Sequence, residues 1–313
     1  MDTESKAGRN QGWTYFDRIS PPSAGIEVLQ FYAHNYPHST RDIWSERIAG
    51  GLVRLDDQPT TCETVVHTGQ RLSYHRPPWR EPEAPTQFAV AHADDDLIAI
   101  IKPSGLPVLP GGHFLNRTLL HQVRRKLGAH LVPLHRLGRG TSGLVLFAAS
   151  PRAKTDLCRA FRTGSIRKRY RALVVGTDIP DTFSVEVPIG RVAYGPVGNL
   201  YAATEAGAPA RSECWVRRRD LATRQTILEV EIPTGRPHQI RIHLAAAGYP
   251  LVGDRLYGPG GVPRDQNPGE RWALPGDCGY HLHARCIGFA HPGSGKWHEI
   301  SCRPPAPLRC DGE

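Results

Sequence analysis

The stretch Leu134–Gly143, LHRLGRGTSG, runs directly into the apolar segment 144–149, LVLFAA, and the rest of the chain is organised around it. Three glycines within its last six residues let the backbone turn tightly and approach a ligand closely. His135, Arg136 and Arg139 supply donors suited to phosphate or to a polarised base. The pattern indicates either a basic loop that binds an anionic partner or a glycine-rich turn whose arginines are solvated before a buried strand.

The composition is that of a positively charged globular chain. Of its 313 residues, 39% are hydrophobic, which is enough for one large domain and a smaller one. The 39 Lys and Arg against 30 Asp and Glu give a net charge of +9, which favours a polyanion such as RNA, DNA or an anionic membrane. No apolar run approaches the roughly 20 residues that span a bilayer. The polar N-terminus lacks the apolar segment of a signal peptide, so we expect a cytoplasmic protein.

The cysteines and carboxylates do not predict a metal site. Seven cysteines form no Cys-x-x-Cys pair and are expected to be reduced thiols. The C-terminal cysteines and histidines lack the spacings of structural zinc ligands. They are Cys278, His281, His283, Cys286, His291, His298 and Cys302. The acidic run Asp94–Asp96 is expected to be a solvated turn before the apolar segment 97–101.

The patterns divide the chain into four parts. Residues 1–20 are polar and lack periodicity, so they are expected to be a loose tail. Residues 21–75 contain two helical patterns, a glycine stop at Gly50-Gly51 and two strands separated by a polar turn, which together make a compact αα-ββ unit. Residues 76–87 hold four prolines among charges and are expected to be an extended linker. Residues 88–313 remain as one large domain.

Four further blocks carry polar residues at fixed spacings within that domain. They are KPSGLPV at 102–108, KRYRALVVG at 168–176, TGRPHQIRIHL at 234–244 with GYPLVGDRLYG at 248–258, and YHLHA at 280–284 with His291-Pro292. With the stretch at 134–144, these blocks resemble, in the same order, the signatures of the RluA-type pseudouridine synthases. Members of that family isomerise uridine in structured RNA. The resemblance covers roughly residues 88–292.

The resemblance implies a fold and a partner. The fold is α+β, with a mixed, mainly antiparallel sheet, flanking helices and a central cleft lined by the loops at Lys102, His135 and Arg241. The unit at 21–75 is similar to the small RNA-binding module named after ribosomal small-subunit protein four, which many family members carry. The implied partner is structured RNA, either rRNA or tRNA. The resemblance implies no cofactor, no membrane association and a monomer.

It also implies roles for individual residues. Tyr170 matches the tyrosine that stacks on the target base, and Arg241 matches the arginine that pairs with the catalytic aspartate. The position of that aspartate, directly after His-Arg-Leu, is Gly138 in this chain. These three positions are the candidate catalytic residues. The candidate RNA-binding residues are Lys102, His135, Arg136, Arg139, Thr141, Arg236, His238 and Gln239 in the large domain, with Arg41, Arg47 and Arg54 in the small one.

Gly138 puts the chemistry in question, because glycine cannot act as nucleophile, general base or electrostatic stabiliser. Arg241 must therefore bind another acceptor, contact water or meet an RNA phosphate. Asp254, or the group Asp94–Asp96, is a candidate substitute carboxylate. The Gly-Asp-x-x-Tyr-Gly context of Asp254 instead suits a turn in which the carboxylate accepts from backbone amides.

Three functions remain open. The first is a pseudouridine synthase that breaks the glycosidic bond of uridine, turns the uracil and rejoins it through carbon. The alternative is a catalytically silent RNA-binding protein or RNA-folding chaperone of the same fold. A DNA-binding regulator fits the charge, but the chain has no recognisable helix-turn-helix pattern. A carboxylate that binds Arg241 and faces the cleft would favour the enzyme, and a cleft without one would favour the silent form.

Overall fold

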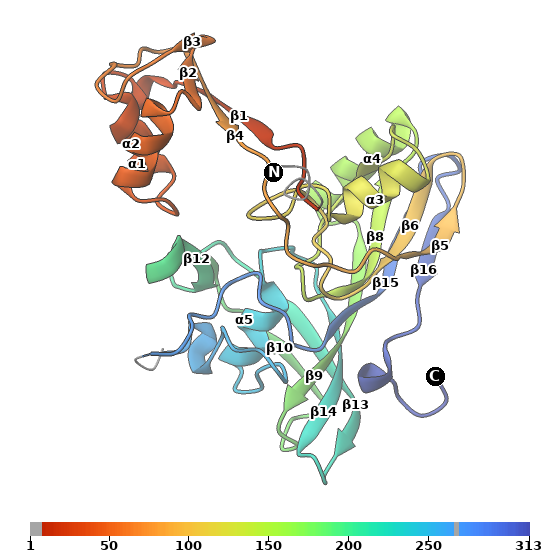
Figure 1. Ribbon diagram of the computed structural model, residues 1–313. Coiled ribbons are helices and arrows are strands. Elements are labelled where there is room, and N and C mark those ends of the chain that lie inside the picture. Colours follow the sequence, from red (N-terminus) through yellow and green to blue (C-terminus); the bar gives the residue numbers. More distant parts are fainter. Residues whose placement is uncertain (1–7, 266–268) are drawn as a thin grey trace. The chain divides into compact units, whose positions relative to one another are not determined.

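The structure, a computed structural model, describes residues 8–265 and 269–313, which form two compact units (Figure 1). Unit 1 is the described part of Met1–Glu81 together with Gly195–Gly198. Unit 2 comprises Pro82–Tyr194 and the described part of Asn199–Glu313. No helix in the described ranges is long and apolar enough to cross a membrane.

Unit 1 packs two short helices on one face of an antiparallel sheet of order β1-β4-β2-β3. Thr40 caps the second helix by accepting a hydrogen bond from the backbone of Ile43. Tyr32 and Trp44 stack with ring centroids 4.5 Å apart in its core. The elements are β1 (Trp13–Arg18), the 3₁₀ helix η2 (Pro21–Ser23), α1 (Val28–Asn35), α2 (Arg41–Ala49), β2 (Val53–Leu55), β3 (Gln58–Pro59) and β4 (Arg71–Arg76).

The expectation of a loose tail over residues 1–20 is wrong for 13–18, which form strand β1. This strand pairs with β4 along its whole length, from Trp13 opposite Arg76 to Arg18 opposite Arg71. Tyr15 of β1 also stacks on Tyr74 of β4. The segment WTYFDR carries aromatic residues on both faces, so it lacks the alternation that marks a half-buried strand. Its pairing depends on a partner more than 50 residues away. Residues 1–7 of the expected tail lie outside the described ranges.

The boundary between the units falls at Glu81-Pro82, within the segment 76–87 that was expected to be a linker. The first half of this segment is tied to unit 1. The backbone N–H of Asn10 donates to the carbonyl oxygen of Trp79 at 3.0 Å, and the side chain of Asn10 donates to Glu81 at 3.1 Å. Asn10 and Glu81 are both buried. Residues 76–81 are therefore part of a packed unit and not an extended linker.

Unit 2 is built on a ten-stranded sheet, in which eight strands follow the order β10-β13-β14-β9-β15-β8-β6-β5. In addition, β16 pairs with β15 and β7 pairs with β8. All pairs are antiparallel except β15 with β8. The strands are β5 (Ala89–Ala93), β6 (Leu97–Lys102), β7 (Val132–Pro133), β8 (Ser142–Ala148), β9 (Arg167–Val175), β10 (Thr182–Val185), β13 (Ser212–Asp220), β14 (Gln225–Glu231), β15 (Leu282–Ala290) and β16 (Trp297–Ser301).

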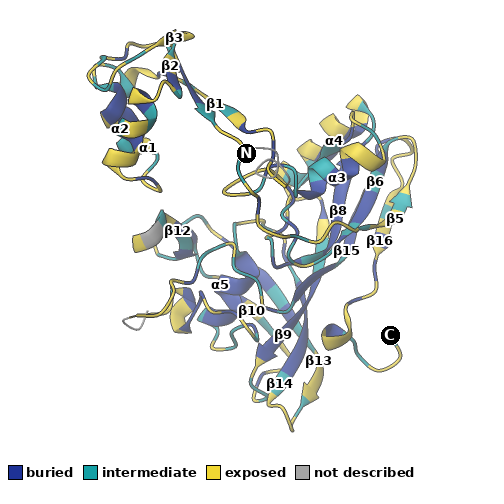
Figure 2. Cartoon of the chain, viewed as in Figure 1, coloured by how far each residue is buried: buried dark blue, intermediate teal, exposed yellow. Residues whose placement is uncertain are grey.

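Helices cover both faces of this sheet. The helices are α3 (Leu119–Lys126), α4 (Pro151–Thr163) and α5 (Gln239–Ala246), with short 3₁₀ turns η4 (Pro259–Gly261) and η5 (Ala306–Leu308). Along β8, Leu144 and Leu146 pack in one cluster with residues of α4. Val145 and Phe147 point to the other face and pack in a second cluster with residues of α3 and α5. The apolar run of β8 is therefore buried on both faces of the sheet. Figure 2 shows β8, β9 and β15 as largely buried. The predicted α+β class with a mixed, mainly antiparallel sheet is confirmed.

The strands β11 (Ile189–Tyr194) and β12 (Gly198–Ala203) form a separate two-stranded sheet, joined by the 3₁₀ turn η3 (Gly195–Val197).

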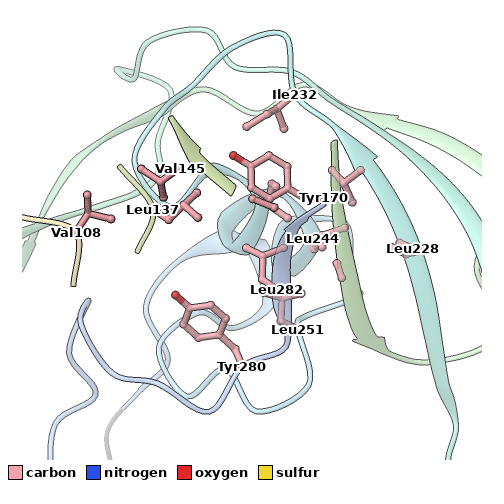
Figure 3. Packing of buried hydrophobic residues seen from close by; sticks show 14 of the residues in the cluster. Val108, Leu137, Val145, Tyr170, Leu228, Ile232, Leu244, Leu251, Tyr280 and Leu282 are labelled. Atoms are coloured by element: carbon pink, nitrogen blue, oxygen red, sulfur yellow. The ribbon is translucent and has the colours of Figure 1, made fainter. Parts of the chain in front are cut away.

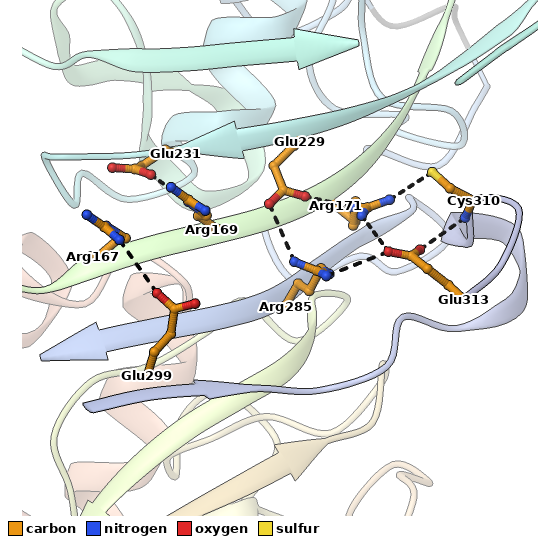
Figure 4. A network of polar contacts seen from close by, with 9 residues as sticks. All are labelled: Arg167, Arg169, Arg171, Glu229, Glu231, Arg285, Glu299, Cys310 and Glu313. Atoms are coloured by element: carbon orange, nitrogen blue, oxygen red, sulfur yellow. Dashed lines mark hydrogen bonds and ion pairs between the residues drawn. The ribbon is translucent and has the colours of Figure 1, made fainter. Parts of the chain in front are cut away.

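Strand β9 separates charged from cavity-facing residues by its period of two. On one face Arg169 and Arg171 donate to Glu231 and Glu229, each at 2.7 Å (Figure 4). The buried Arg171 also donates to Glu313 at 2.7 Å, so the network ties the end of the chain to the sheet. Tyr170, between the two arginines, points to the opposite face and joins the apolar cluster beside the candidate site.

Candidate nucleic-acid site

Unit 2 contains a cavity of about 420 Å³ where the glycine-rich loop, the start of α5 and the segment before β15 meet. Arg136, Arg139, Arg236 and Arg241 contribute to its lining. An apolar part is formed by Tyr170 and by the leucine and isoleucine side chains of Leu137, Ile232, Ile240 and Leu282, several of which Figure 3 labels. No Asp or Glu occurs among the described residues that line it. Arginines around an apolar slot suit a ligand that combines phosphate with a flat, uncharged ring.

All three candidate catalytic positions, Gly138, Tyr170 and Arg241, line this cavity. Six of the candidate RNA-binding residues of the large domain line it as well: Arg136, Arg139, Thr141, Arg236, His238 and Gln239. Burial raises the pKa of Tyr170 to about 12, so its hydroxyl is neutral at physiological pH. Lys102 and His135 are not among the lining residues.

Lys102 supports the glycine-rich loop through hydrogen bonds to backbone carbonyl groups. Its side chain is fully buried, and Nζ donates to the carbonyl oxygens of Pro103, Leu106 and Arg139 at 2.9, 2.7 and 3.1 Å. Burial lowers its pKa to about 7. These three backbone acceptors around the ammonium group join segment 103–106 to the glycine-rich loop. A contact of Lys102 with RNA stays a prediction.

His135 likewise supports the loop from inside. Its Nε2 accepts a hydrogen bond from the backbone N–H of Leu146 at 3.0 Å, and its ring lies 4.8 Å from that of Phe161. Desolvation lowers the pKa of His135 to about 3, so the ring is neutral. The imidazole of His135 is neutral, half-buried and bonded to β8, so it offers no charge to RNA and its position does not support the predicted binding role.

Gln239 and His238 shape the turn that begins α5. Gln239 is buried and accepts hydrogen bonds from Thr234 Oγ1 at 2.8 Å and from the backbone N–H of Arg236 at 3.0 Å. His238 has a positive φ of 57°, and its Nδ1 lies 2.7 Å from the hydroxyl of Tyr257. Burial lowers the pKa of His238 to about 3. These contacts fix the backbone that presents Arg236 to the cavity.

Of the three partners considered for Arg241, which were another acceptor, water and an RNA phosphate, the structure shows an acceptor within the protein. Its Nε and Nη2 donate to the two carboxylate oxygens of Asp254 at 2.7 and 2.8 Å, and Nη1 donates to Pro275 at 3.2 Å. The side chains of Arg241 and Asp254 are 3% and 1% exposed. Burial alone would raise the pKa of Asp254, but the hydrogen bonds and charge of Arg241 hold it below its usual value. Asp254 also accepts from the backbone N–H of Leu256, as its sequence context predicted, and it does not line the cavity.

Gly138 lies at the rim of the cavity, directly in front of Tyr280. A Cβ atom at position 138 would lie 3.0 Å from the hydroxyl oxygen of Tyr280 and 3.5 Å from Oγ1 of Thr141. Tyr280 is buried, and its hydroxyl lies 3.2 Å from Oγ1 of Thr141. Tyr280 is the first residue of the YHLHA block, but no role was predicted for it, because an aromatic residue within a motif has no signal of its own.

The three arginines predicted to bind RNA in unit 1 do not form one surface. Arg41 is the exposed first residue of α2. Arg47 lies over the ring of Trp44 at 4.4 Å and donates to Ser39 at 3.0 Å, which makes it part of the packing. Arg54 alternates with the core residue Val53 along β2, so it lies on the sheet face opposite the helices.

That opposite face, here called the open sheet face, is basic and carries one exposed aromatic ring. Strand register assigns to it Thr14, Phe16, Arg18, Arg54, Arg71, Ser73 and His75. Phe16 is 59% exposed, and the guanidinium of Arg71 lies 5.2 Å from its ring centroid. Phe16 and Arg18 were not among the predicted site residues because they fell within the expected tail.

The mixed sheet with its basic, partly aromatic cavity is the architecture of a pseudouridine synthase domain, and similar proteins carry that name. The sequence model of the RNA pseudouridylate synthase family matches residues 96–246. An uncharacterised RNA pseudouridine synthase of Synechocystis is 48% identical over 84% of this chain and 89% of its own length. RNA pseudouridine synthase 5 of Arabidopsis thaliana is 41% identical over 89% of this chain and 88% of its own length.

Ribosomal large subunit pseudouridine synthase D of Nitrosomonas europaea is 31% identical over 93% of this chain and 85% of its own length. The structure of human RNA pseudouridylate synthase domain containing 1 shares the fold, with a TM-score of 0.56 at 21% identity, over 72% of this chain and 86% of that one. The chain belongs to the RluA-type family of RNA pseudouridine synthases.

Proposed function

We propose that this protein binds structured RNA and takes an extruded uridine into the cavity of unit 2 without isomerising it. The observation that carries this proposal is the lining of the cavity. Four arginines and Tyr170 surround it, and no carboxylate lies among its described lining residues. Arginines hold the phosphates beside the flipped nucleotide, and Tyr170 offers a face on which the base stacks.

The missing carboxylate supports the silent form. Isomerisation requires a carboxylate beside the detached base, and Gly138 provides none. Asp254 is ionised and carries the charge, but both of its oxygens are bound to Arg241 within the protein interior. Base capture without chemistry fits an RNA-binding protein or an RNA-folding chaperone.

A second candidate function is isomerisation through Asp254, which one specific observation favours. The guanidinium of Arg241 lines the cavity and holds Asp254 on its other side. A change of rotamer at Arg241 on RNA binding would bring its guanidinium and the carboxylate of Asp254 toward the base. This candidate is also supported by the similarity to relatives that are named RNA pseudouridine synthases.

Pseudouridine mapping of total RNA from cells with and without the gene separates the two candidates. We expect no site to be lost with the gene, while ultraviolet crosslinking still recovers a defined RNA from the protein. A site restored by the natural protein and abolished by Asp254→Asn would establish isomerisation instead. Gly138→Asp should be supplied both alone and with Tyr280→Phe, because the tyrosine hydroxyl occupies the space that the new side chain needs.

We further propose that the RNA is ribosomal, that unit 1 contributes a second contact to it, and that the protein acts in the cytoplasm as a monomer without a cofactor. The relative from Nitrosomonas europaea is named for the large ribosomal subunit, which supports the choice of RNA. The net charge of +9 supports binding to a polyanion. Sequencing of the crosslinked RNA tests its identity, and light scattering of the purified protein tests its oligomeric state.

A further inference from the structure

Tyr280 and the glycines of the loop Arg136–Thr141 fit together as one arrangement. A Cβ atom at Gly140 would lie 2.9 Å from two ring carbons of Tyr280, and one at Gly138 would lie 3.0 Å from its hydroxyl oxygen. Neither glycine has a positive φ, so the backbone at both positions accepts any L-residue. Tyr280, and not the backbone, therefore limits the side chain at both positions: its ring excludes one at Gly140, and its hydroxyl leaves little room for one at Gly138.

Other contacts hold Tyr280 in this place from behind. The guanidinium of Arg241 lies 4.3 Å from the centroid of its ring, and Arg241 is itself fixed by Asp254. The backbone before Tyr280 packs against the turn that carries Asp254, since a Cβ at Gly253 would lie 2.2 Å from the carbonyl oxygen of Gly279. The ring is therefore held between the loop and Arg241.

The hydroxyl of Tyr280 is the polar group that occupies the space in front of Gly138. Burial raises the pKa of Tyr280, so at physiological pH the phenol is neutral and keeps its proton. A neutral phenol cannot replace a carboxylate as nucleophile or base, but it can donate one hydrogen bond. Thr141 Oγ1, at 3.2 Å, is its one partner among the hydrogen bonds of the described residues, and both side chains line the cavity.

We propose that Tyr280 positions the captured base, with its hydroxyl donating a hydrogen bond to a carbonyl oxygen of the pyrimidine in the space before Gly138. This inference rests on the proposed capture of uridine in the cavity. It assigns Gly138, Gly140 and Tyr280 to one binding corner that receives the base in place of a carboxylate. Uracil suits this corner because it offers two carbonyl oxygens as acceptors.

The ligand test uses the full-length protein with two probes, uridine 5′-monophosphate and ribose 5-phosphate, in titration calorimetry. Natural protein is expected to bind the nucleotide more tightly, since ribose 5-phosphate has no base. Tyr280→Phe should weaken the nucleotide about fivefold, the worth of one neutral hydrogen bond, and leave ribose 5-phosphate unchanged. Tyr249→Phe, a tyrosine outside the cavity lining, serves as the matched control.

The outcomes separate the two proposals. Equal weakening of both probes in Tyr280→Phe would mean that the tyrosine only supports the fold, which overturns its assignment. A natural protein that does not prefer the nucleotide over ribose 5-phosphate would overturn base capture itself. An affinity for the nucleotide that is unchanged in Tyr280→Phe would leave base capture intact and remove Tyr280 from it.

A second measurement tests the fit of ring and glycine without any ligand. Gly140→Ala should lower the melting temperature by roughly 5 °C in natural protein, because the new methyl group overlaps the ring. In a Tyr280→Ala background the same change should have almost no effect. Equal losses in both backgrounds would show that the tyrosine does not select glycine at this position.

Discussion

The cavity of unit 2 and the open sheet face of unit 1 both gather arginines, but they hold them differently. In the cavity Arg241 is fixed by a bidentate buried carboxylate and lies against aromatic rings. On the open sheet face Arg18 and Arg54 are exposed and share the face with one exposed ring, Phe16. A preformed cavity can select one base, whereas an exposed basic face gives affinity that salt weakens. The two regions should therefore respond differently to substitution.

The largest expected effect is in the buried ion pair. Asp254→Ala leaves the guanidinium of Arg241 buried without its carboxylate, which should lower the free energy of unfolding of unit 2 by about 3–5 kcal/mol. Urea denaturation at pH 7 measures it. Asp311→Ala, which breaks an ion pair with a carboxylate that is 97% exposed, is the control and should change stability little. A loss below about 1 kcal/mol for Asp254→Ala would mean that the cavity arginine is as free as those of unit 1.

Next in size is the response to pH. Folding holds the pKa values of His135 and His238 at about 3, against about 6.5 in the unfolded chain. Between these values the unfolded chain binds more protons, so the free energy of unfolding should fall as the pH falls below about 6.5. The slope should be about 1 kcal/mol per pH unit for each histidine. The pKa of Asp254 is lowered, so its contribution is present above about 3.9 and is lost only at more acidic pH.

The measurement is urea denaturation at intervals between pH 7 and pH 5. His135→Gln, whose amide oxygen can still accept from Leu146, should reduce the slope by about 1 kcal/mol per pH unit. His67→Gln, at an exposed position of unit 1, should leave it unchanged. An unchanged slope in His135→Gln would show that this imidazole titrates normally and is open to solvent.

The residues behind these predictions also show which features of the fold and the site could be predicted from the sequence and which could not. The five blocks were enough to predict the fold class and to collect Tyr170, Arg236 and Arg241 at one cavity, because motif order reflects shared topology. The roles of Lys102 and His135 were not predictable in the same way. Their partners are backbone groups, which every residue carries, so no residue type signals that the side chain is already satisfied.

The same limit applies to unit 1. Strand β1 depends on pairing with β4, and Arg47 depends on the ring of Trp44. Both are contacts of a folded unit and leave no periodic trace in their own segment. By contrast, the need of Arg241 for a new acceptor followed from physical chemistry alone, since a buried guanidinium must be paired. Asp254, the acceptor in the structure, had been considered only as a substitute for the catalytic carboxylate, and its turn motif predicted its bonds to backbone amides.

A smaller effect is expected on the open sheet face. Phe16→Ser should weaken binding of a 12-nucleotide oligouridine by roughly tenfold, because one stacked base contributes about 1–3 kcal/mol. Fluorescence anisotropy measures it. The dependence on salt should not change, since no charge is removed. Leu221→Ser, another exposed apolar residue, should have no effect; equal weakening in both variants would remove any special role of the open face.

The smallest expected effect distinguishes two arginines of unit 1, Arg54 and Arg47. Arg54 is exposed on the open sheet face, so Arg54→Ser should reduce the slope of log affinity against log salt by about 1 and leave stability unchanged. Arg47 is stacked on Trp44 and bonded to Ser39, so Arg47→Ser should leave the slope unchanged and lower the free energy of unfolding of unit 1 by about 1 kcal/mol. Anisotropy titrations at 50 to 200 mM salt and urea denaturation give both quantities for both variants. If Arg47→Ser changed the slope as much as Arg54→Ser does, RNA would have to reach the helical side of the sheet, and the open face would not be the binding surface of unit 1.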